Sequence, residues 1–187
     1  MTDTKSRLLD LLREKSFRRG TFTLTSGKTS DFFIDCKPTV LTAEGHVLVG
    51  RLLLEGLSRV PGPVHAVAGV ELGGCPLASA VSLTSFLEGR PLDAVYVRKQ
   101  AKGHGTKKLL EGADRLPGGA RVVVLEDTVT TGGSTLRAVE SIREHGIEVA
   151  GVLAIVDRSE GGSEAIRGAG LHFESLFRRA DFMGEGA

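Results

Sequence analysis

The stretch VVVLEDTVTTGGST, residues 122–135, places two adjacent carboxylates, several hydroxyl side chains and two glycines directly after four apolar residues. A glycine-containing turn that leads into a helix binds phosphate well, because its unpaired backbone N–H groups and the helix dipole both attract an anion. Glu126 and Asp127 would repel a phosphate alone, so the ligand must also offer hydroxyls or a bound Mg²⁺ to these carboxylates. A phosphorylated sugar offers both. The alternative is a buried strand that ends in a capped turn with solvated acids, but the combined pattern favours a functional site.

A second group of residues that could do chemistry lies within residues 95–112. Six basic side chains fall within eleven residues without one acid, and glycines flank the histidine: Arg98, Lys99, Lys102, His104, Lys107 and Lys108. Such a loop suits a lid that closes over a polyanion and neutralises the charge of a leaving group. A solvated basic turn and an RNA-contacting patch are the alternatives. Because only Tyr96 lies nearby and aromatic residues make up 5% of the chain, no base-stacking platform is expected, and we predict no nucleic-acid partner.

Two other glycine-containing stretches look like nucleotide-binding motifs but fail their spacing. Gly27-Lys28-Thr29 ends like a Walker A loop, yet Phe22 stands where that motif needs its first glycine. The segment GVELGG, residues 69–74, lacks the third glycine of the dinucleotide-binding fingerprint. It remains a strand-to-helix turn whose backbone amides are free to bind phosphate.

Helical and strand patterns alternate along the chain. Helical spacing of apolar residues predicts helices at about 4–15, 43–59 and 76–87, from 132–134 to Gly146, and briefly at 163–167. Strand patterns fall at 21–25, which starts a hairpin, and at 64–70, 93–97, 121–125 and 149–157. The near-continuous aliphatic strands predict an α/β fold with a central, mostly parallel sheet flanked by helices on both faces. Ligands bind at the carboxyl ends of the strands in such a sheet, which is where Glu126 and the glycine turn fall.

Composition sets the remaining limits. A length of 187 residues with 41% hydrophobic residues fits one globular domain. The 24 basic and 23 acidic residues nearly cancel, so no overall field favours nucleic acid or a membrane. Cys36 and Cys75 show neither CxxC nor metal-site spacing, which suits a reducing compartment and argues against structural zinc. No apolar run approaches 18 residues and the first residues lack a secretory apolar core, so we expect a soluble, cytoplasmic protein with no membrane partner.

Three of these segments resemble a known family. VVVLEDTVTTGGST resembles the phosphoribosyl pyrophosphate (PRPP) motif of the class I phosphoribosyltransferases. TLTSGKTSDFFID, residues 23–35, and VRKQAKGHG, residues 97–105, are similar to the corresponding segments of the orotate phosphoribosyltransferases within that class. The likeness spans most of the chain. It implies the class I phosphoribosyltransferase fold as one domain over residues 1–187, with about residues 1–40, the N-terminal helix and hairpin, forming a small hood that binds the base.

The resemblance also implies an activity. Orotate phosphoribosyltransferases move the 5-phosphoribosyl group from PRPP to orotate, giving orotidine 5′-monophosphate and diphosphate in de novo pyrimidine biosynthesis. The expected cofactor is Mg²⁺, and the expected assembly is a homodimer in which the loop at 98–108 reaches the neighbouring active site. Two alternatives stay open. A purine phosphoribosyltransferase would keep the phosphate site but lack Lys28, Phe32 and Phe33, and a non-catalytic regulator that binds the phosphoribosyl ligand would show a basic face outside the active loop.

The resemblance assigns roles by position. Glu126 and Asp127 hold the ribose hydroxyls, directly or through waters on Mg²⁺, and Asp127 is counted among the catalytic residues. The 5′-phosphate is surrounded by Thr130, Thr131, Gly132, Gly133 and Ser134. Other contacts to PRPP come from Thr128 and from the turn formed by Leu72, Gly73 and Gly74. The catalytic loop that engages the diphosphate supplies Arg98, Lys99, Lys102 and His104. The orotate contacts are Lys28, Phe32, Phe33, Thr130 and Arg158, the last on the carboxylate.

One position departs from the family pattern. Many members carry a lysine in the loop that approaches the diphosphate, three residues before the Pro-Leu-Ala segment, where this chain has Gly73. The backbone amides of residues 72–74 are the expected substitute for that cation. The resemblance also suggests a strained, cis peptide bond near Glu71-Leu72.

Overall fold

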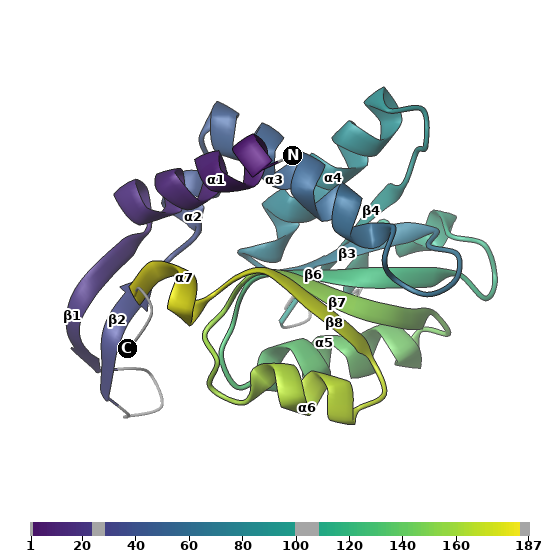
Figure 1. Cartoon of the computed structure of the whole chain (residues 1–187). Coiled ribbons are helices and arrows are strands. Elements are labelled where there is room, and N and C mark those ends of the chain that lie inside the picture. The colour runs from purple at the N-terminus through teal and green to yellow at the C-terminus, as the bar shows by residue number, and fades with distance from the viewer. Residues whose placement is uncertain (1, 24–28, 100–108, 184–187) are drawn as a thin grey trace, which may run out of the picture.

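A computed structural model describes residues 2–23, 29–99 and 109–183. A six-stranded sheet forms its centre, in the order β5-β4-β3-β6-β7-β8 (Figure 1). The strands are β3 (Ala66–Val70), β4 (Asp93–Val97), β5 (Leu110–Glu111), β6 (Arg121–Val129), β7 (Glu148–Asp157) and β8 (His172–Arg178). All neighbouring pairs are parallel except β4 and β5. The prediction of an α/β fold with a mostly parallel central sheet is therefore confirmed.

Helices cover both faces of this sheet (Figure 1). One face carries α3 (Ala43–Leu57) and α4 (Gly74–Leu87), and the other carries α5 (Gly133–Glu144) and α6 (Gly162–Gly168). Alternate residues of β6 point to opposite faces, so Val123 and Leu125 join the apolar cluster under α3 and α4, while Val122 and Val124 join the cluster over α5. Because both faces are covered, the strands carry the continuous aliphatic runs seen in the sequence.

The N-terminal region forms a separate small layer beside the sheet (Figure 1). It consists of α1 (Thr2–Lys15), β1 (Phe17–Thr23), β2 (Thr29–Ile34) and the short α2 (Lys37–Val40), and β1 and β2 pair as an antiparallel hairpin. The C-terminal helix α7 (Arg179–Met183) joins this region to the sheet, because Phe182 stacks on Phe17 with ring centroids 5.5 Å apart and meets Phe177 of β8 at 6.2 Å. Aromatic packing of this kind adds to the stability that burial provides.

Several elements differ from the sequence prediction. Strand β6 continues to Val129, four residues beyond the predicted end, so Glu126 and Asp127 belong to the strand. Strand β8 was not predicted. It lies at the edge of the sheet, where only Phe173 and Phe177 among its seven residues are buried, so its apolar pattern is weak. The short α2, β5, α7 and the 3₁₀ turn at Ala113–Arg115 were also not predicted. Among the helices of the described residues, none combines the length and apolar character needed to cross a membrane.

Candidate active site

The acidic pair, Glu126 and Asp127, lies near the carboxyl end of the central strand β6. Glu126 is 6% exposed, and its Oε1 accepts a hydrogen bond from the hydroxyl of Thr135 at 2.8 Å. Burial raises the pKa of Glu126 to about 7, an effect that the Thr135 hydrogen bond partly opposes. Burial also raises the pKa of Asp127, whose Oδ1 accepts the backbone N–H of Thr128 at 2.9 Å. Two adjacent carboxyl groups with raised pKa values, one buried and one half-buried, are suited to a positively charged or hydroxyl-bearing ligand.

The turn after β6, residues 130–134, is the segment predicted to surround the 5′-phosphate, and we call it the phosphate loop. Gly132 adopts a φ of +79°, a left-handed conformation that favours glycine, and α5 begins at the next residue. The loop is fixed from outside, because the N–H of Gly162 donates to the carbonyl of Thr130 at 3.0 Å and the N–H of Arg158 donates to the carbonyl of Val129 at 2.9 Å. The backbone N–H groups of the first turn of a helix have no partner within it, so this loop presents donors suited to a phosphate.

The turn at 71–74 lies against the acidic pair. The peptide bond between Glu71 and Leu72 is cis, as the family resemblance suggested. A Cβ atom on Gly73 would lie 2.2 Å from Oδ2 of Asp127 and 2.3 Å from its Cγ, which no real side chain tolerates. The carboxylate of Asp127 therefore occupies the space that a side chain at residue 73 would need. The fold brings together two of the segments predicted to contact PRPP.

Residues 35–37, directly after β2, lie next to Asp127, and the sequence reasoning missed them. The thiol of Cys36 is completely buried and donates to the carbonyl of Asp127 at 3.5 Å. Nζ of Lys37 lies 2.6 Å from Oδ1 of Asp35, and this hydrogen bond raises the pKa of Lys37. The charge of Lys37 in turn favours the ionised form of Asp127, although burial outweighs it. The available signal was the acid, thiol and base of the segment IDCK, residues 34–37, at the end of the predicted hairpin.

The N-terminal hairpin contacts the C-terminal part of the chain through Phe32, whose ring lies between the guanidinium groups of Arg158 and Arg179. Phe32 is 1% exposed, and the guanidinium carbon of Arg158 lies 4.5 Å from the centre of its ring. Arg179 approaches the same ring at 5.5 Å. Phe33 points to the opposite face of β2, is 41% exposed, and packs on Phe22 at 5.6 Å. Of the two phenylalanines predicted to contact the base, Phe33 thus offers an accessible face, while Phe32 backs Arg158.

The first part of the cationic loop continues from β4. Arg98 lies 3.3 Å from the carboxylate of Glu111, and the backbone N–H of Lys99 donates to the carboxylate of Glu71. The positive charge of Lys99 acts on Glu126 and favours its ionised form, which places this lysine on the side of the acidic pair. Lys28, Lys102 and His104, which were predicted from the sequence as site residues, lie outside the described residues.

Comparison with known proteins is consistent with this geometry. Residues 46–168 match the family described as "Phosphoribosyl transferase domain". An orotate phosphoribosyltransferase from Sorangium cellulosum (strain So ce56) is 60% identical over 179 residues, which cover 96% of this chain and 93% of that protein. The chain belongs to the orotate phosphoribosyltransferase family.

Solved structures of the orotate phosphoribosyltransferase family share the fold. The Mycobacterium tuberculosis H37Rv enzyme in complex with Fe(III) dicitrate is 38% identical, with a TM-score of 0.81 over 96% of this chain and 99% of that one. The same enzyme in complex with PRPP aligns with a TM-score of 0.77 and 36% identity, covering 96% of this chain and 98% of that chain. These coverages include the hood as well as the sheet, so the resemblance inferred from three short segments extends over nearly the whole chain.

The structure explains why residue 73 is a glycine and not the lysine that many family members carry. Gly73 has an ordinary φ of −66°, so the backbone itself would accept another residue there. The obstacle is the carboxylate of Asp127, which lies within 2.2 Å of the position of a Cβ atom. A lysine at residue 73 could enter only if Asp127 moved, which links the missing cation to the position of the acidic pair.

Proposed function

We propose that the chain transfers the 5-phosphoribosyl group from PRPP to orotate, giving orotidine 5′-monophosphate and diphosphate in pyrimidine biosynthesis. The observation that carries the proposal is the acidic pair near the end of β6, with Glu126 buried and Asp127 half-buried, which is followed at once by the phosphate loop and faced by the cis peptide turn. Membership of the orotate phosphoribosyltransferase family fixes the reaction and the base. The Mycobacterium tuberculosis enzyme, whose complex with PRPP has been solved, supports PRPP as the donor.

Each part of PRPP has a group of residues to receive it. The 5′-phosphate lies in the phosphate loop, where backbone N–H groups and the hydroxyls of Thr130, Thr131 and Ser134 donate to its oxygens. The ribose hydroxyls donate to the carboxylates of the acidic pair. Thr128 adds a hydroxyl nearby, and the diphosphate lies over the 72–74 turn, where Leu72 is exposed and Gly73 is half-buried.

Mg²⁺ fits this site as a partner of the substrate. Among residues 2–23, 29–99 and 109–183, no group of three or more His, Cys, Asp or Glu side chains could hold a metal ion. Two adjacent carboxylates supply too few oxygens for octahedral Mg²⁺, so Glu126 and Asp127 would share the ion with oxygens of PRPP or with its water ligands. When bound, the ion neutralises charge on the diphosphate.

The chemical step is a substitution at the anomeric carbon of the ribose. The bond between this carbon and the diphosphate oxygen breaks, and the bonding electrons leave with the diphosphate while positive charge develops on the ribose ring. A ring nitrogen of orotate forms the new bond from the opposite face and releases its N–H proton to solvent. The carboxylate of Asp127 stabilises the developing positive charge. The cations Arg98, Lys99, Lys102 and His104 stabilise the departing diphosphate.

Orotate binds beneath the hood in this proposal. Its carboxylate pairs with Arg158, whose side chain is held by the ring of Phe32 at 4.5 Å and by Glu160 at 2.9 Å. Phe33 provides an apolar wall for the planar ring, and Thr130 and Lys28 complete the polar contacts. Residues 1–40 act as a base-binding hood within a single domain over residues 1–187.

A homodimer is the proposed assembly, with the 98–108 loop reaching the neighbouring active site. Large apolar side chains are exposed along α3 and α4, at Val47, Leu83, Phe86 and Leu87, with exposed fractions of 51% to 74%. Exposed apolar groups that cluster on neighbouring helices are typical of a protein–protein interface. We place the enzyme in the cytoplasm.

The test is a transfer assay with the purified chain, PRPP and Mg²⁺. Loss of orotate absorbance is followed, and adenine, hypoxanthine, xanthine and uracil are offered in parallel. We expect consumption of orotate that depends on both PRPP and Mg²⁺. Consumption of a purine instead would keep the phosphate loop and overturn the base assignment, and no reaction with any base would overturn the enzymatic proposal.

A further inference from the structure

Lys37 is the first residue of the short helix α2, and contacts on both sides fix its backbone. The preceding residue, Cys36, is completely buried, and its thiol donates to the carbonyl of Asp127 at 3.5 Å. Two residues after Lys37, the buried hydroxyl of Thr39 donates to the carbonyl of Leu11 at 3.1 Å, which joins α2 to α1. These contacts hold the start of α2 beside the acidic pair, on the side of the hood.

The charge of Lys37 acts on two carboxylates. Its Nζ lies 2.6 Å from Oδ1 of Asp35. Burial raises the pKa of Asp127, the charge of Lys37 is the largest effect that opposes this rise, and the charge of Asp35 adds to it. Among the described residues, Lys37 is thus the cation that acts most strongly on Asp127, although Asp35 is its nearest partner.

The 72–74 turn needs a positive charge that it cannot carry itself. In the proposed function, on which this inference rests, the diphosphate of PRPP lies over this turn. The carboxylate of Asp127 occupies the space that a side chain at residue 73 would need. A diphosphate close to this carboxylate is repelled by it, because like charges a few ångströms apart raise the free energy. Gly73 carries no charge, and Asp127 leaves no room for a charged side chain there.

We propose that Lys37 is a positioning residue for PRPP. Its ammonium group offsets the negative charge of Asp127 from the side of the hood, so that this carboxylate and the diphosphate can both lie at the 72–74 turn. Lys37 acts through Asp127 and not by contact with the substrate. Its effect adds to that of Mg²⁺ and of the loop cations, which act on the diphosphate itself.

An ion pair with a purely structural role would give a different pattern of variants. Loss of either charge of the pair formed by Lys37 and Asp35 would then have the same effect. If Lys37 acts on Asp127, the two losses have opposite effects, because the charge of Asp35 counteracts that of Lys37. Asp35→Asn removes only the charge, since the amide oxygen can still accept from Nζ and from the backbone N–H of Lys37, which now donates to Oδ1 at 3.1 Å.

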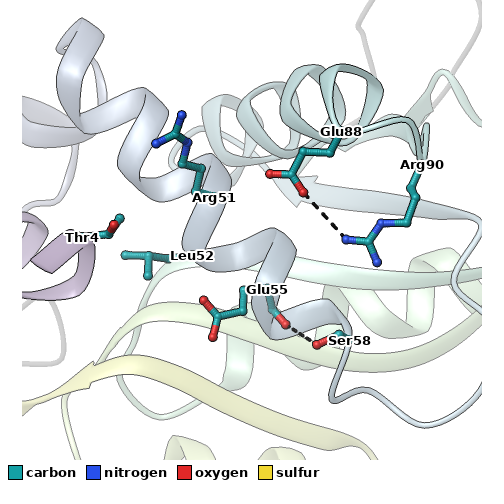
Figure 2. Close-up of a pocket in the computed structure, with 7 residues that line it drawn as sticks. All are labelled: Thr4, Arg51, Leu52, Glu55, Ser58, Glu88 and Arg90. Atoms are coloured by element: carbon teal, nitrogen blue, oxygen red, sulfur yellow. Dashed lines mark hydrogen bonds and ion pairs between the residues drawn. The ribbon is translucent and has the colours of Figure 1, made fainter. Parts of the chain in front are cut away.

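A control is provided by an ion pair with the same sequence spacing in another part of the molecule. Arg90 lies 3.7 Å from Glu88, at a groove of about 420 Å³ among α1, α3 and the end of α4 (Figure 2). Helix α4 starts directly after Gly73 and has 14 residues, so its far end, which Arg90 follows, lies about 20 Å from the acidic pair. Arg90→Gln therefore removes the cation of a similar pair away from the site.

Calorimetric titration of the full chain with PRPP and Mg²⁺, at one fixed protein concentration, measures the effect. We expect Lys37→Gln to weaken PRPP binding about fivefold, the upper range for a half-exposed charge, and Lys37→Arg to restore it to within about twofold of wild type. Asp35→Asn should bind PRPP as tightly as wild type or more tightly. Arg90→Gln should bind like wild type.

The same titration in the Asp127→Asn background tests whether Lys37 acts through Asp127. Once this carboxylate is neutral, Lys37→Gln should change PRPP binding by less than about twofold. Three results would overturn the inference: wild-type binding by Lys37→Gln, equal weakening by Lys37→Gln and Asp35→Asn, or the same loss with and without the charge of Asp127. Should Lys37→Gln fail to fold, weaker PRPP binding by Asp35→Asn would still contradict it.

Transfer to orotate is measured separately, so the two proposals can fail independently. A wild-type chain that binds PRPP, shows the expected pattern of variants and consumes no orotate would overturn the proposed function alone. A chain that consumes orotate while its PRPP binding is insensitive to Lys37→Gln would overturn the role of Lys37 alone.

Discussion

Replacement of Glu126 by glutamine measures how much the buried negative charge lowers the free energy of unfolding. Glutamine has nearly the same shape, and its amide oxygen can still accept from the hydroxyl of Thr135, so the change removes only the ionisable group. Burial raises the pKa of Glu126 from 4.5 to about 7. The folded state therefore holds the proton more tightly than the unfolded chain. The stability contributed by this group is fully present below pH 4.5 and is lost as the pH rises to about 7.

The size of the effect follows from that shift. With these two pKa values, the free-energy penalty of ionising Glu126 in the folded state grows by about 2.5 kcal/mol between pH 5 and pH 8. Glu126→Gln removes the penalty, so the difference in free energy of unfolding between variant and wild type should increase by about that amount over the same interval. The variant should be more stable than wild type at pH 8 and much less active.

Urea unfolding of both proteins at pH 5 and pH 8, at one fixed protein concentration, measures this difference. Glu140→Gln on the exposed side of α5 is the control and should change the free energy of unfolding by no more than about 0.5 kcal/mol at either pH. If the difference between Glu126→Gln and wild type is the same at both pH values, the carboxylate is not destabilised by burial, and the account of the acidic pair is wrong.

Three further predictions concern activity. Gly73→Ala should lower kcat/KM at least tenfold, because its Cβ would displace the carboxylate of Asp127, whereas Gly118→Ala, where no atom lies within 4 Å of the new Cβ, should keep wild-type activity; equal activity of the two variants would contradict this. Lys102→Ala should lower turnover by about 10²-fold to 10³-fold with the circular dichroism spectrum unchanged, and turnover within threefold of wild type would refute its role toward the diphosphate. Arg158→Gln should raise KM for orotate at least tenfold and leave KM for PRPP within threefold, and an equal rise in both constants would argue against carboxylate recognition.

Much of the fold could be predicted from the sequence because the sheet is buried on both faces. Short runs of β-branched aliphatic residues, such as that from Val122 to Leu125, favour buried strands, and the helices between them show a clear apolar face. The edge strand β8 escaped prediction because Phe173 and Phe177 are its only buried residues. The predicted end of β6 was too early because Glu126 and Asp127 are acidic, and acidic residues are rarely found in a buried strand.

Site residues could be predicted from the sequence where they lie in one continuous segment with a characteristic pattern. The phosphate loop is one continuous segment, so its residues could be named before the fold was known. The support of Asp127 by Cys36 and Lys37 joins segments about 90 residues apart, and pairing over such distances depends on the tertiary fold. The packing of Arg158 on Phe32 also depends on the tertiary fold. The sequence predicted that both residues contact orotate, but it did not predict that Phe32 would be buried beneath the arginine.

The central claim is that this chain makes orotidine 5′-monophosphate from orotate and PRPP with Asp127 at the reacting centre. The most direct measurement is a product balance in which orotate, orotidine 5′-monophosphate and diphosphate are quantified during one reaction, with wild type and Asp127→Asn side by side. We expect one nucleotide and one diphosphate for each orotate consumed by wild type, and a rate at least 10²-fold lower for Asp127→Asn. Diphosphate release without the nucleotide, or an Asp127→Asn enzyme as fast as wild type, would contradict the account.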